Sequence, residues 1–330
     1  MPIRVTFQPE NHLPPVVESP KPKDIMENES AVLPPRGRKT APNPPERDKV
    51  PEILAELNSL VGLSTVKELI GELQAYVEIQ RRRTREKLNA ESLVLHMIFR
   101  GNPGTGKTTV ARLISRLFKE MEVLQKGHLV ECERADLVGE YIGHTAQKTR
   151  DQVKKALGGV LFVDEAYSLA RGGEKDFGKE AIDALVKAME DHKNEFILIL
   201  AGYRHEMDWF MQTNPGLRSR FPINIDFPDY TLDELLDIGE LMLKDRQYEF
   251  TAETREAFRF MLQGLLNSHP YAGNARLVRN MAEKAIRKQA VRLFKKPSST
   301  REELIQILPV DLTLDEIKPQ DSSYRTKIVL

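Results

Sequence analysis

Three glycines, a lysine and two threonines stand in one run of eight residues, Gly101-Asn102-Pro103-Gly104-Thr105-Gly106-Lys107-Thr108. Glycines allow backbone conformations and close approaches that a Cβ would block, so successive N–H groups can converge on one anion. The lysine ammonium can then reach the β- and γ-phosphates of a nucleotide, and the next hydroxyl can ligate Mg²⁺. The run therefore predicts a phosphate-binding loop, the P-loop (101–108), for ATP and Mg²⁺. The residues expected to contact nucleotide are Asn102, Pro103, Gly104, Thr105, Gly106, Lys107, Thr108 and Thr109, with Lys107 also catalytic and Thr108 also a metal ligand.

The chain around the P-loop has the pattern that such a loop needs. An apolar run from Leu93 to Phe99 precedes it and predicts a buried parallel strand, and a segment of helix formers begins at Lys107. The unpaired N–H groups at the start of that helix favour an anion. A glycine-rich turn without a ligand is the alternative.

A second group of candidate residues follows another apolar run. Val160-Leu161-Phe162-Val163 predicts a strand that delivers Asp164 and Glu165 at its carboxyl end, where ligands bind in open α/β sheets. Asp164 is expected to hold Mg²⁺, and Glu165 to polarise the water that attacks the γ-phosphate. The two carboxylates turn a nucleotide site into a predicted ATPase site.

Five short apolar runs separated by helical patterns predict an α/β fold with a five-stranded parallel sheet. Beyond Asp229 the apolar spacing is helical throughout, which predicts a small helical lid domain. Thr231, Thr251 and Asn274 stand where helix N-caps are expected, as does Ser64 in the first half of the chain. The expected organisation is a proline-rich arm (1–50), an α/β nucleotide-binding domain (51–228), the lid (229–318) and a flexible tail (319–330).

Composition limits the classes of function. The chain has 49 Lys and Arg against 49 Asp and Glu, so nothing indicates a general nucleic-acid or membrane binder. Cys132 is the single cysteine, which excludes an intrachain disulfide and a multi-cysteine metal site. Eleven of the 20 prolines lie in residues 1–50, which predicts a disordered arm. The first residues lack the apolar core of a signal peptide, so a cytoplasmic location is expected.

The P-loop, the Asp164-Glu165 pair and the helical domain together resemble an AAA+ ATPase. Within that superfamily, residues 134–149 and 161–169 are similar to the CbxX/CfqX family, and residues 170–183 are most similar to its sporulation proteins. The resemblance covers about residues 52 to 300.

The resemblance implies roles for further residues. Val61 and Gly62 match the element beside the adenine base. Arg220 matches the arginine finger that one subunit supplies to the γ-phosphate of its neighbour, with Arg218 as the alternative. Arg276 resembles the sensor-2 arginine of the lid. Arg279, one turn further along, is the other candidate for sensor 2.

Two loops carry further implied roles. Tyr141 and Ile142 match the pore loop that lines the channel of an AAA+ ring, where an exposed aromatic can press on any peptide. The sensor-1 position departs from the usual Asn or Thr, because Ala201-Gly202-Tyr203 occupies it, and Tyr203 is the candidate there.

These features favour an ATP-hydrolysing homo-oligomeric ring, by resemblance a hexamer, that remodels a client protein through its pore in a sporulation-related role. Rubisco-activase-like remodelling is a narrower variant. A DNA-linked AAA+ ATPase of the helicase-loader or clamp-loader type is an alternative, because Arg81-Arg82-Arg83 and residues 287–296 are basic. A nucleotide-dependent assembly switch is another. The sequence names neither the client nor the role of the arm.

Overall fold

The computed structural model describes residues 49–89, 94–141, 143–172, 176–213, 215–268 and 273–312. The predicted arm, apart from Lys49 and Val50, and the predicted tail lie outside these residues. Val50 is the first residue of helix α1 (Val50–Ser59), which the longer α2 (Ser64–Arg85) follows. None of the described helices is both long and apolar enough to cross a membrane.

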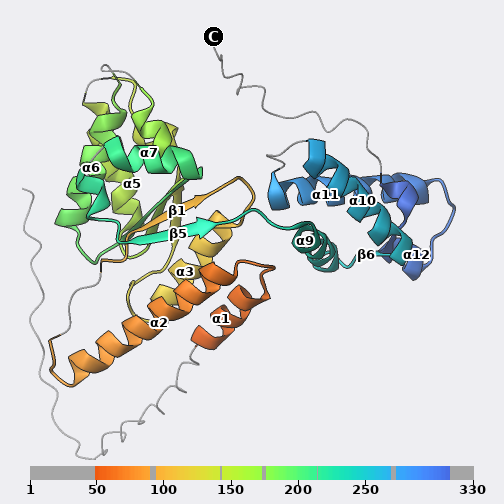
Figure 1. Cartoon of the computed structure of the whole chain (residues 1–330), viewed down its shortest axis with the longest axis horizontal. Coiled ribbons are helices and arrows are strands. Elements are labelled where there is room, and N and C mark those ends of the chain that lie inside the picture. The colour runs from red at the N-terminus through yellow and green to blue at the C-terminus, as the bar shows by residue number, and fades with distance from the viewer. Residues whose placement is uncertain are drawn as a thin grey trace, which may run out of the picture. The chain divides into compact units, whose positions relative to one another are not determined.

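A five-stranded parallel sheet forms the centre of the larger part of the fold (Figure 1), and this confirms the predicted fold class. Its strands are β1 (Met97–Gly101), β2 (Leu129–Cys132), β3 (Val160–Val163), β4 (Ile197–Gly202) and β5 (Ile223–Phe227). They lie in the order β2-β3-β4-β1-β5. Ile199 of β4 pairs with Met97 of β1 on one side and with Phe162 of β3 on the other. The carboxyl ends of β1 and β3 therefore flank that of β4.

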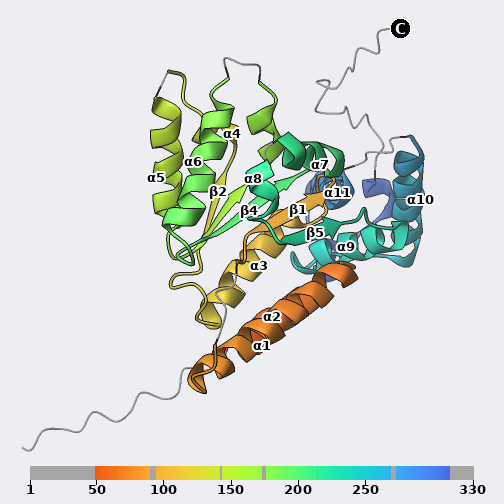
Figure 2. The ribbon, with the colours of Figure 1, turned by 60° about the vertical axis from the view of Figure 1, so that its left-hand side comes forward.

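Helices cover both faces of the sheet (Figures 1 and 2). Side chains alternate along each strand, so Met97 and Phe99 pack on one face while Ile98 packs on the other. The first face lies under α1, α2 and α3 (Lys107–Glu120). The helices of the second face are α4 (Arg134–Leu137), α5 (His144–Ala156), η1 (Ala166–Ala170), α6 (Gly178–Asp191), α7 (Arg204–Thr213) and α8 (Pro215–Arg218).

The helical lid begins after β5. Its main helices are α9 (Leu232–Lys244), α10 (Ala252–Ser268) and α11 (Asn274–Phe294), and Leu235, Phe258 and Val278 pack together in their core. Thr231 caps α9, since its hydroxyl accepts the Glu234 N–H, and Thr251 accepts the Thr254 N–H at 3.2 Å. Both caps were predicted from the sequence.

Two other predicted caps are wrong. Ser64 is the first residue of α2, and the cap position belongs to Leu63, whose left-handed backbone has φ 57°. Asn274 is likewise the first residue of α11, after Gly273. Its side chain instead forms hydrogen bonds with Tyr230 and Asp229, outside α11.

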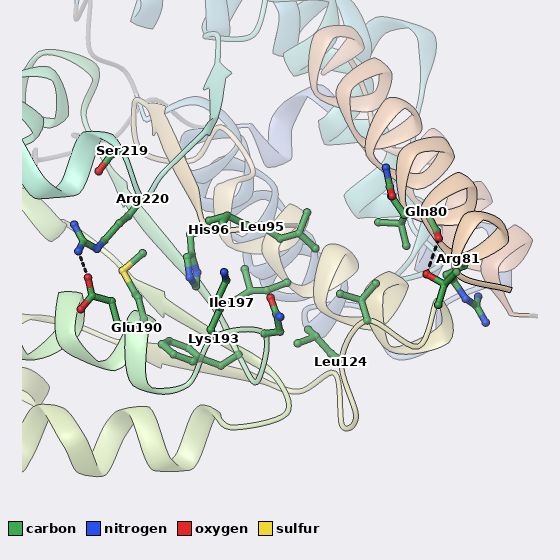
Figure 3. Close-up of a pocket in the computed structure, with 17 residues that line it drawn as sticks. Gln80, Arg81, Leu95, His96, Leu124, Glu190, Lys193, Ile197, Ser219 and Arg220 are labelled. Carbon is green, nitrogen blue, oxygen red and sulfur yellow. Dashed lines mark hydrogen bonds and ion pairs between the residues drawn. The ribbon is translucent and has the colours of Figure 1, made fainter. Parts of the chain in front are cut away.

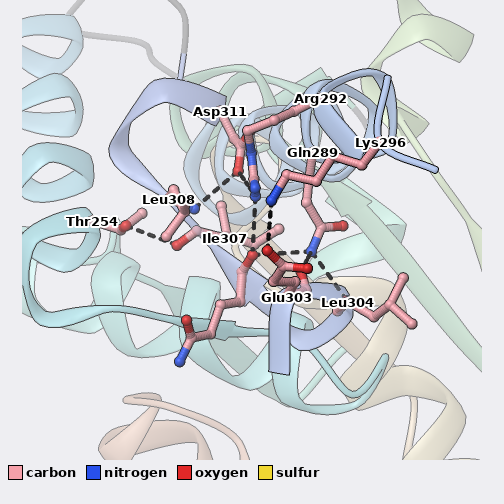
Figure 4. Close-up of polar contacts among 10 residues, drawn as sticks. Thr254, Gln289, Arg292, Lys296, Glu303, Leu304, Ile307, Leu308 and Asp311 are labelled. Atoms are coloured by element: carbon pink, nitrogen blue, oxygen red, sulfur yellow. Dashed lines mark hydrogen bonds and ion pairs between the residues drawn. The ribbon is translucent and has the colours of Figure 1, made fainter. Parts of the chain in front are cut away.

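Polar contacts fasten the last described residues to α11 (Figure 4). These residues form α12 (Arg301–Ile305), β7 (Gln306–Ile307), which pairs with β6 (Glu249–Phe250), and η2 (Pro309–Asp311). Arg292 of α11 donates from Nε to Asp311 Oδ1 and from Nη2 to Asp311 Oδ2, both at 2.8 Å. Gln289 Nε2 donates to the carbonyl of Gln306 at 3.0 Å. The carboxylate of Asp311 is buried, so its ion pair with Arg292 holds η2 against α11.

Candidate active site

The P-loop adopts the conformation that its glycines predict. It joins β1 to α3, and Gly104 and Gly106 have φ of +76° and +95°. Both values lie in the left-handed region that residues with a Cβ rarely adopt. Thr105 is buried between them and donates from its hydroxyl to the Asn102 carbonyl at 2.8 Å.

Lys107 is a half-buried cation that turns back onto its own loop. Its Nζ donates to the carbonyls of Gly101 and Asn102, both at 2.8 Å. Burial lowers the pKa of Lys107, while Asp164, Asp229 and Glu165 act in the opposite direction and Arg276 adds to the lowering. No carboxylate forms an ion pair with Lys107 in the described part of the chain, so an incoming phosphate meets an ammonium group that is held only by carbonyls.

Asp164 and Glu165 follow β3 at the same edge of the sheet as the P-loop. Two strand spacings separate β3 from β1, which amounts to about 10 Å. The Asp164 N–H donates to the Cys132 carbonyl at 2.9 Å, and its carboxylate accepts the Glu165 N–H at 3.0 Å. Glu165 is exposed and has φ 47°, an uncommon left-handed conformation for a residue with a side chain. The pair thus faces the space beside the P-loop.

These residues fit a magnesium nucleotide. The positive φ of Gly104 and Gly106 shapes a loop for an anion, and the Thr108 side chain is half-buried at the start of α3. Thr108 and Asp164 would hold Mg²⁺, which neutralises phosphate charge when it is bound. Thr109, also predicted to contact nucleotide, is exposed in this structure.

The predicted base-side element lies against the lid. Gly62 has φ +62°, and a Cβ there would collide with the Glu234 carboxylate. Val61 packs with the apolar core of the lid. The Tyr230 hydroxyl donates to the Thr105 carbonyl at 3.3 Å, and burial, aided by Glu234, raises the pKa of Tyr230 to about 12. No sequence motif marks Tyr230, which follows β5, as a site residue.

Arg276 lies on the first turn of α11, close to the P-loop backbone. A Cβ at Gly104 would lie 2.9 Å from the Arg276 nitrogen. The side chains of Arg276 and Arg279 are both exposed, and Arg279 lies one turn further along, so the assignment of sensor 2 to Arg276 stays a prediction. Tyr203 packs against Tyr167, with ring centroids 5.9 Å apart, so its role as sensor 1 stays a prediction.

Arg220 lies at the amino ends of the strands, opposite to the P-loop at their carboxyl ends. It borders a cavity of about 530 Å³ that is also lined by Leu95 and His96, which precede β1, and by Phe196, which precedes β4 (Figure 3). Its Nη1 donates to the Gly216 carbonyl at 2.8 Å, and its Nη2 pairs with Glu190 of α6. The length of β1, roughly 16 Å, separates this edge from the P-loop.

The remaining candidates lie apart from the P-loop residues. The Arg218 side chain is exposed, so the choice between Arg218 and Arg220 as the finger stays open. Tyr141 is 66% exposed, in the loop before α5, and its ring lies edge-on to His144 with centroids 5.5 Å apart. Ile142, the second pore-loop candidate, lies outside the described residues.

Comparison with known proteins identifies the family. Residues 97–229 match the model of the ATPase family associated with various cellular activities (AAA), and residues 231–322 match the AAA lid domain. Stage V sporulation protein K of Bacillus subtilis is 55% identical over 267 residues, which cover 80% of this chain and 83% of that protein. Protein CbbX of Cereibacter sphaeroides is 47% identical over 245 residues, 74% of this chain and 79% of that one.

The chain belongs to the CbxX/CfqX family of AAA+ ATPases. It therefore binds and hydrolyses ATP. Another relative of this AAA+ ATPase is the chloroplastic ribulose bisphosphate carboxylase/oxygenase activase of Cyanidioschyzon merolae, 43% identical over 81% of this chain and 92% of that protein.

Solved structures agree on the AAA+ fold. A point mutant of Thermotoga maritima RuvB aligns with a TM-score of 0.51 and 20% identity over 77% of this chain and 69% of that one. The FIGL-1 AAA domain in complex with ADP also aligns with a TM-score of 0.51, at 16% identity, over 77% of this chain and 80% of that one.

Proposed function

We propose that this AAA+ ATPase is one subunit of a homo-hexameric cytoplasmic ring that uses ATP hydrolysis to remodel a client protein through a central pore. The observation that carries the proposal is the place of Arg220, at the edge of the sheet opposite to the P-loop. A finger on this edge cannot reach the phosphates of its own subunit. A second copy of the chain must bring it to them.

Within one site, the residues divide the work of hydrolysis. Lys107 binds the β- and γ-phosphates, and Thr108 and Asp164 hold the metal ion. Glu165 orients the attacking water and takes its proton as the new bond to the γ-phosphorus forms and the bond to the β-phosphate oxygen breaks. Arg220 of the neighbouring subunit and Arg276 of the same subunit stabilise the negative charge on the γ-phosphoryl group while it is transferred.

Tyr141 and Ile142 transmit the motion to the client. An aromatic ring with 66% of its surface exposed suits a contact that grips peptide without reading its sequence. The identity of 55% to stage V sporulation protein K supports a sporulation-related client. The activase named among the relatives supports, as a second candidate, remodelling of Rubisco.

Three single variants test the proposal in one ATPase assay. Glu165→Gln should bind ATP and assemble, as seen by mass photometry, but hydrolyse at least about 10²-fold more slowly, since it lacks the general base.

In the wild type, an unfolded probe such as reduced carboxymethylated α-lactalbumin should stimulate ATP turnover. Tyr141→Ala should lose that stimulation, while Tyr76→Ala, an exposed tyrosine on α2, should keep it.

Two results would contradict the proposal. If Glu165→Gln hydrolyses ATP as fast as the wild type, Glu165 is not the general base. Equal stimulation of Tyr141→Ala and wild type by the unfolded probe would remove the pore contact, and an ATPase that signals through assembly would then explain the chain better.

A further inference from the structure

Asn274 lies where three parts of the chain meet: the P-loop, the linker between β5 and α9, and the first turn of α11. It is 4% exposed, and its backbone has φ 47°. Left-handed backbone is uncommon for residues with a side chain, although asparagine tolerates it better than most. The Asn274 side chain does not cap α11 but forms its hydrogen bonds with residues outside that helix.

Each polar atom of the Asn274 side chain has a partner outside α11. Its Oδ1 accepts the Tyr230 N–H at 3.0 Å. Its Nδ2 donates to Asp229 Oδ1 at 2.8 Å and to the Pro103 carbonyl at 3.3 Å. Asp229 in turn accepts Asn102 Nδ2 at 3.0 and 2.8 Å. One amide and one carboxylate thus join two P-loop residues to the linker and to α11.

Backbone contacts run beside this network. The Ala275 N–H donates to the Gly104 carbonyl at 3.2 Å. A Cβ at Gly104 would collide with the Gly273 carbonyl, so the two backbones touch where the P-loop turns. A change in the position of the P-loop therefore reaches the first turn of α11 directly.

We propose that Asn274 is a positioning residue that couples the P-loop to the lid by holding the first turn of α11, and with it Arg276, in register with the bound phosphates. The inference rests on the role given to Arg276 above. Arg276 follows Asn274 by two residues on the same turn, so the backbone that Asn274 fixes is the backbone that carries the guanidinium. Loss of the network releases that turn from the P-loop.

Asn274→Gly tests the network without backbone strain, because glycine accepts a φ of +47° and removes the side-chain bonds. The measurement is the dissociation constant of N-methylanthraniloyl-AMPPNP, a non-hydrolysable ATP analogue that keeps the γ-phosphate, with Mg²⁺, by fluorescence titration of the full chain. We expect Asn274→Gly and Arg276→Ala each to weaken binding about tenfold. The double variant should bind about as weakly as either single variant, because the second change removes a contact that is already lost.

A merely structural role gives a different pattern. If the losses of Asn274→Gly and Arg276→Ala add, the two residues act independently and the coupling is overturned. An unchanged dissociation constant in Asn274→Gly overturns it as well. An unchanged constant in Arg276→Ala overturns instead the proposed role of Arg276 and the route through it, so the two failures are told apart.

Stability is followed in the same variants. The unfolding midpoint of Asn274→Gly, measured without nucleotide, separates a binding defect from a folding defect. Should Asn274→Gly not fold, Asn274→Asp replaces it. Its side chain keeps the shape and the bond from the Tyr230 N–H but loses both donated bonds and faces Asp229. Nucleotide binding as tight as that of the wild type in this variant overturns the proposal.

Discussion

His96 shows how a single buried side chain links the stability of the fold to pH. It is 7% exposed, its Nδ1 accepts the Leu198 N–H at 3.0 Å, and the rings of Phe196 and Phe221 lie 5.8 and 6.0 Å away. Burial lowers the pKa of His96 to about 4. The native protein therefore keeps His96 neutral at pH values at which the unfolded chain takes up a proton.

The sign of the effect follows from this difference. Above about pH 6.5 neither state is protonated at His96, and below that value only the unfolded state gains a proton, until the folded pKa is reached. The free energy of unfolding should therefore fall by roughly 1–2 kcal/mol more in wild type than in His96→Gln between about pH 7 and pH 5. Glutamine keeps an acceptor but does not titrate. Urea unfolding at both pH values checks this, and parallel losses in the two proteins would contradict it.

At the residue scale, the sequence predicted the groups whose spacing is fixed by chemistry. Lys107 and Glu165 each follow an apolar strand, and that position agrees with the roles that we propose for them. Asp229 and Tyr230 also follow a strand, but no motif marks them. The sequence could not predict Glu190 as the partner of Arg220, because their contact depends on how α6 packs against the segment before β5.

At the element scale, the end of the lid depends on a buried ion pair. Asp311 has 2% of its side chain exposed and joins η2 to α11 through Arg292. The bond to Asp311 raises the pKa of Arg292, so the guanidinium stays charged at all ordinary pH values. Removing the carboxylate leaves that charge without its counter-charge.

Asp311→Ala should therefore lower the free energy of unfolding of the lid by about 2–3 kcal/mol. The matched control is Lys296→Ala, which breaks the more exposed pair with Glu303 but keeps the Glu303 carboxylate that caps α12, and it should cost less than about 1 kcal/mol. Urea denaturation, followed by circular dichroism, measures both. Equal losses in the two variants would show that burial of the pair at Asp311 does not matter.

Apolar periodicity predicted the elements well, because burial determines it. β3 and β4 are buried along their whole length, as the continuous apolar runs predict. Helix starts were less certain: Thr231 and Thr251 are caps, while Ser64 and Asn274 are not. The side chain of Asn274 is drawn to the P-loop, a contact between residues 171 positions apart that local spacing does not encode.

At the scale of the whole molecule, the residues of the proposed shared ATPase site lie at the two opposite ends of the parallel strands. The P-loop, Asp164 and Glu165 lie at the carboxyl edge, and Arg220 lies at the amino edge with Glu190 as its partner. In the proposed ring, Arg220 exchanges that carboxylate for a phosphate of the neighbour. A ring of identical subunits then repeats the same shared site at every boundary.

Mixing two inactive variants tests this shared site most directly. Lys107→Ala lacks the phosphate-binding lysine but keeps its finger, and Arg220→Ala keeps a complete P-loop but offers no finger. Each alone should hydrolyse ATP roughly 10³-fold more slowly than wild type or worse. Mixed, they should recover activity, because Arg220 from the first variant completes sites on the second. Arg218→Ala is measured alone and in the same mixture. The arginine whose variant is inactive alone and regains activity in the mixture is the finger. No recovery at any ratio with either arginine variant would contradict a finger supplied by the neighbouring subunit.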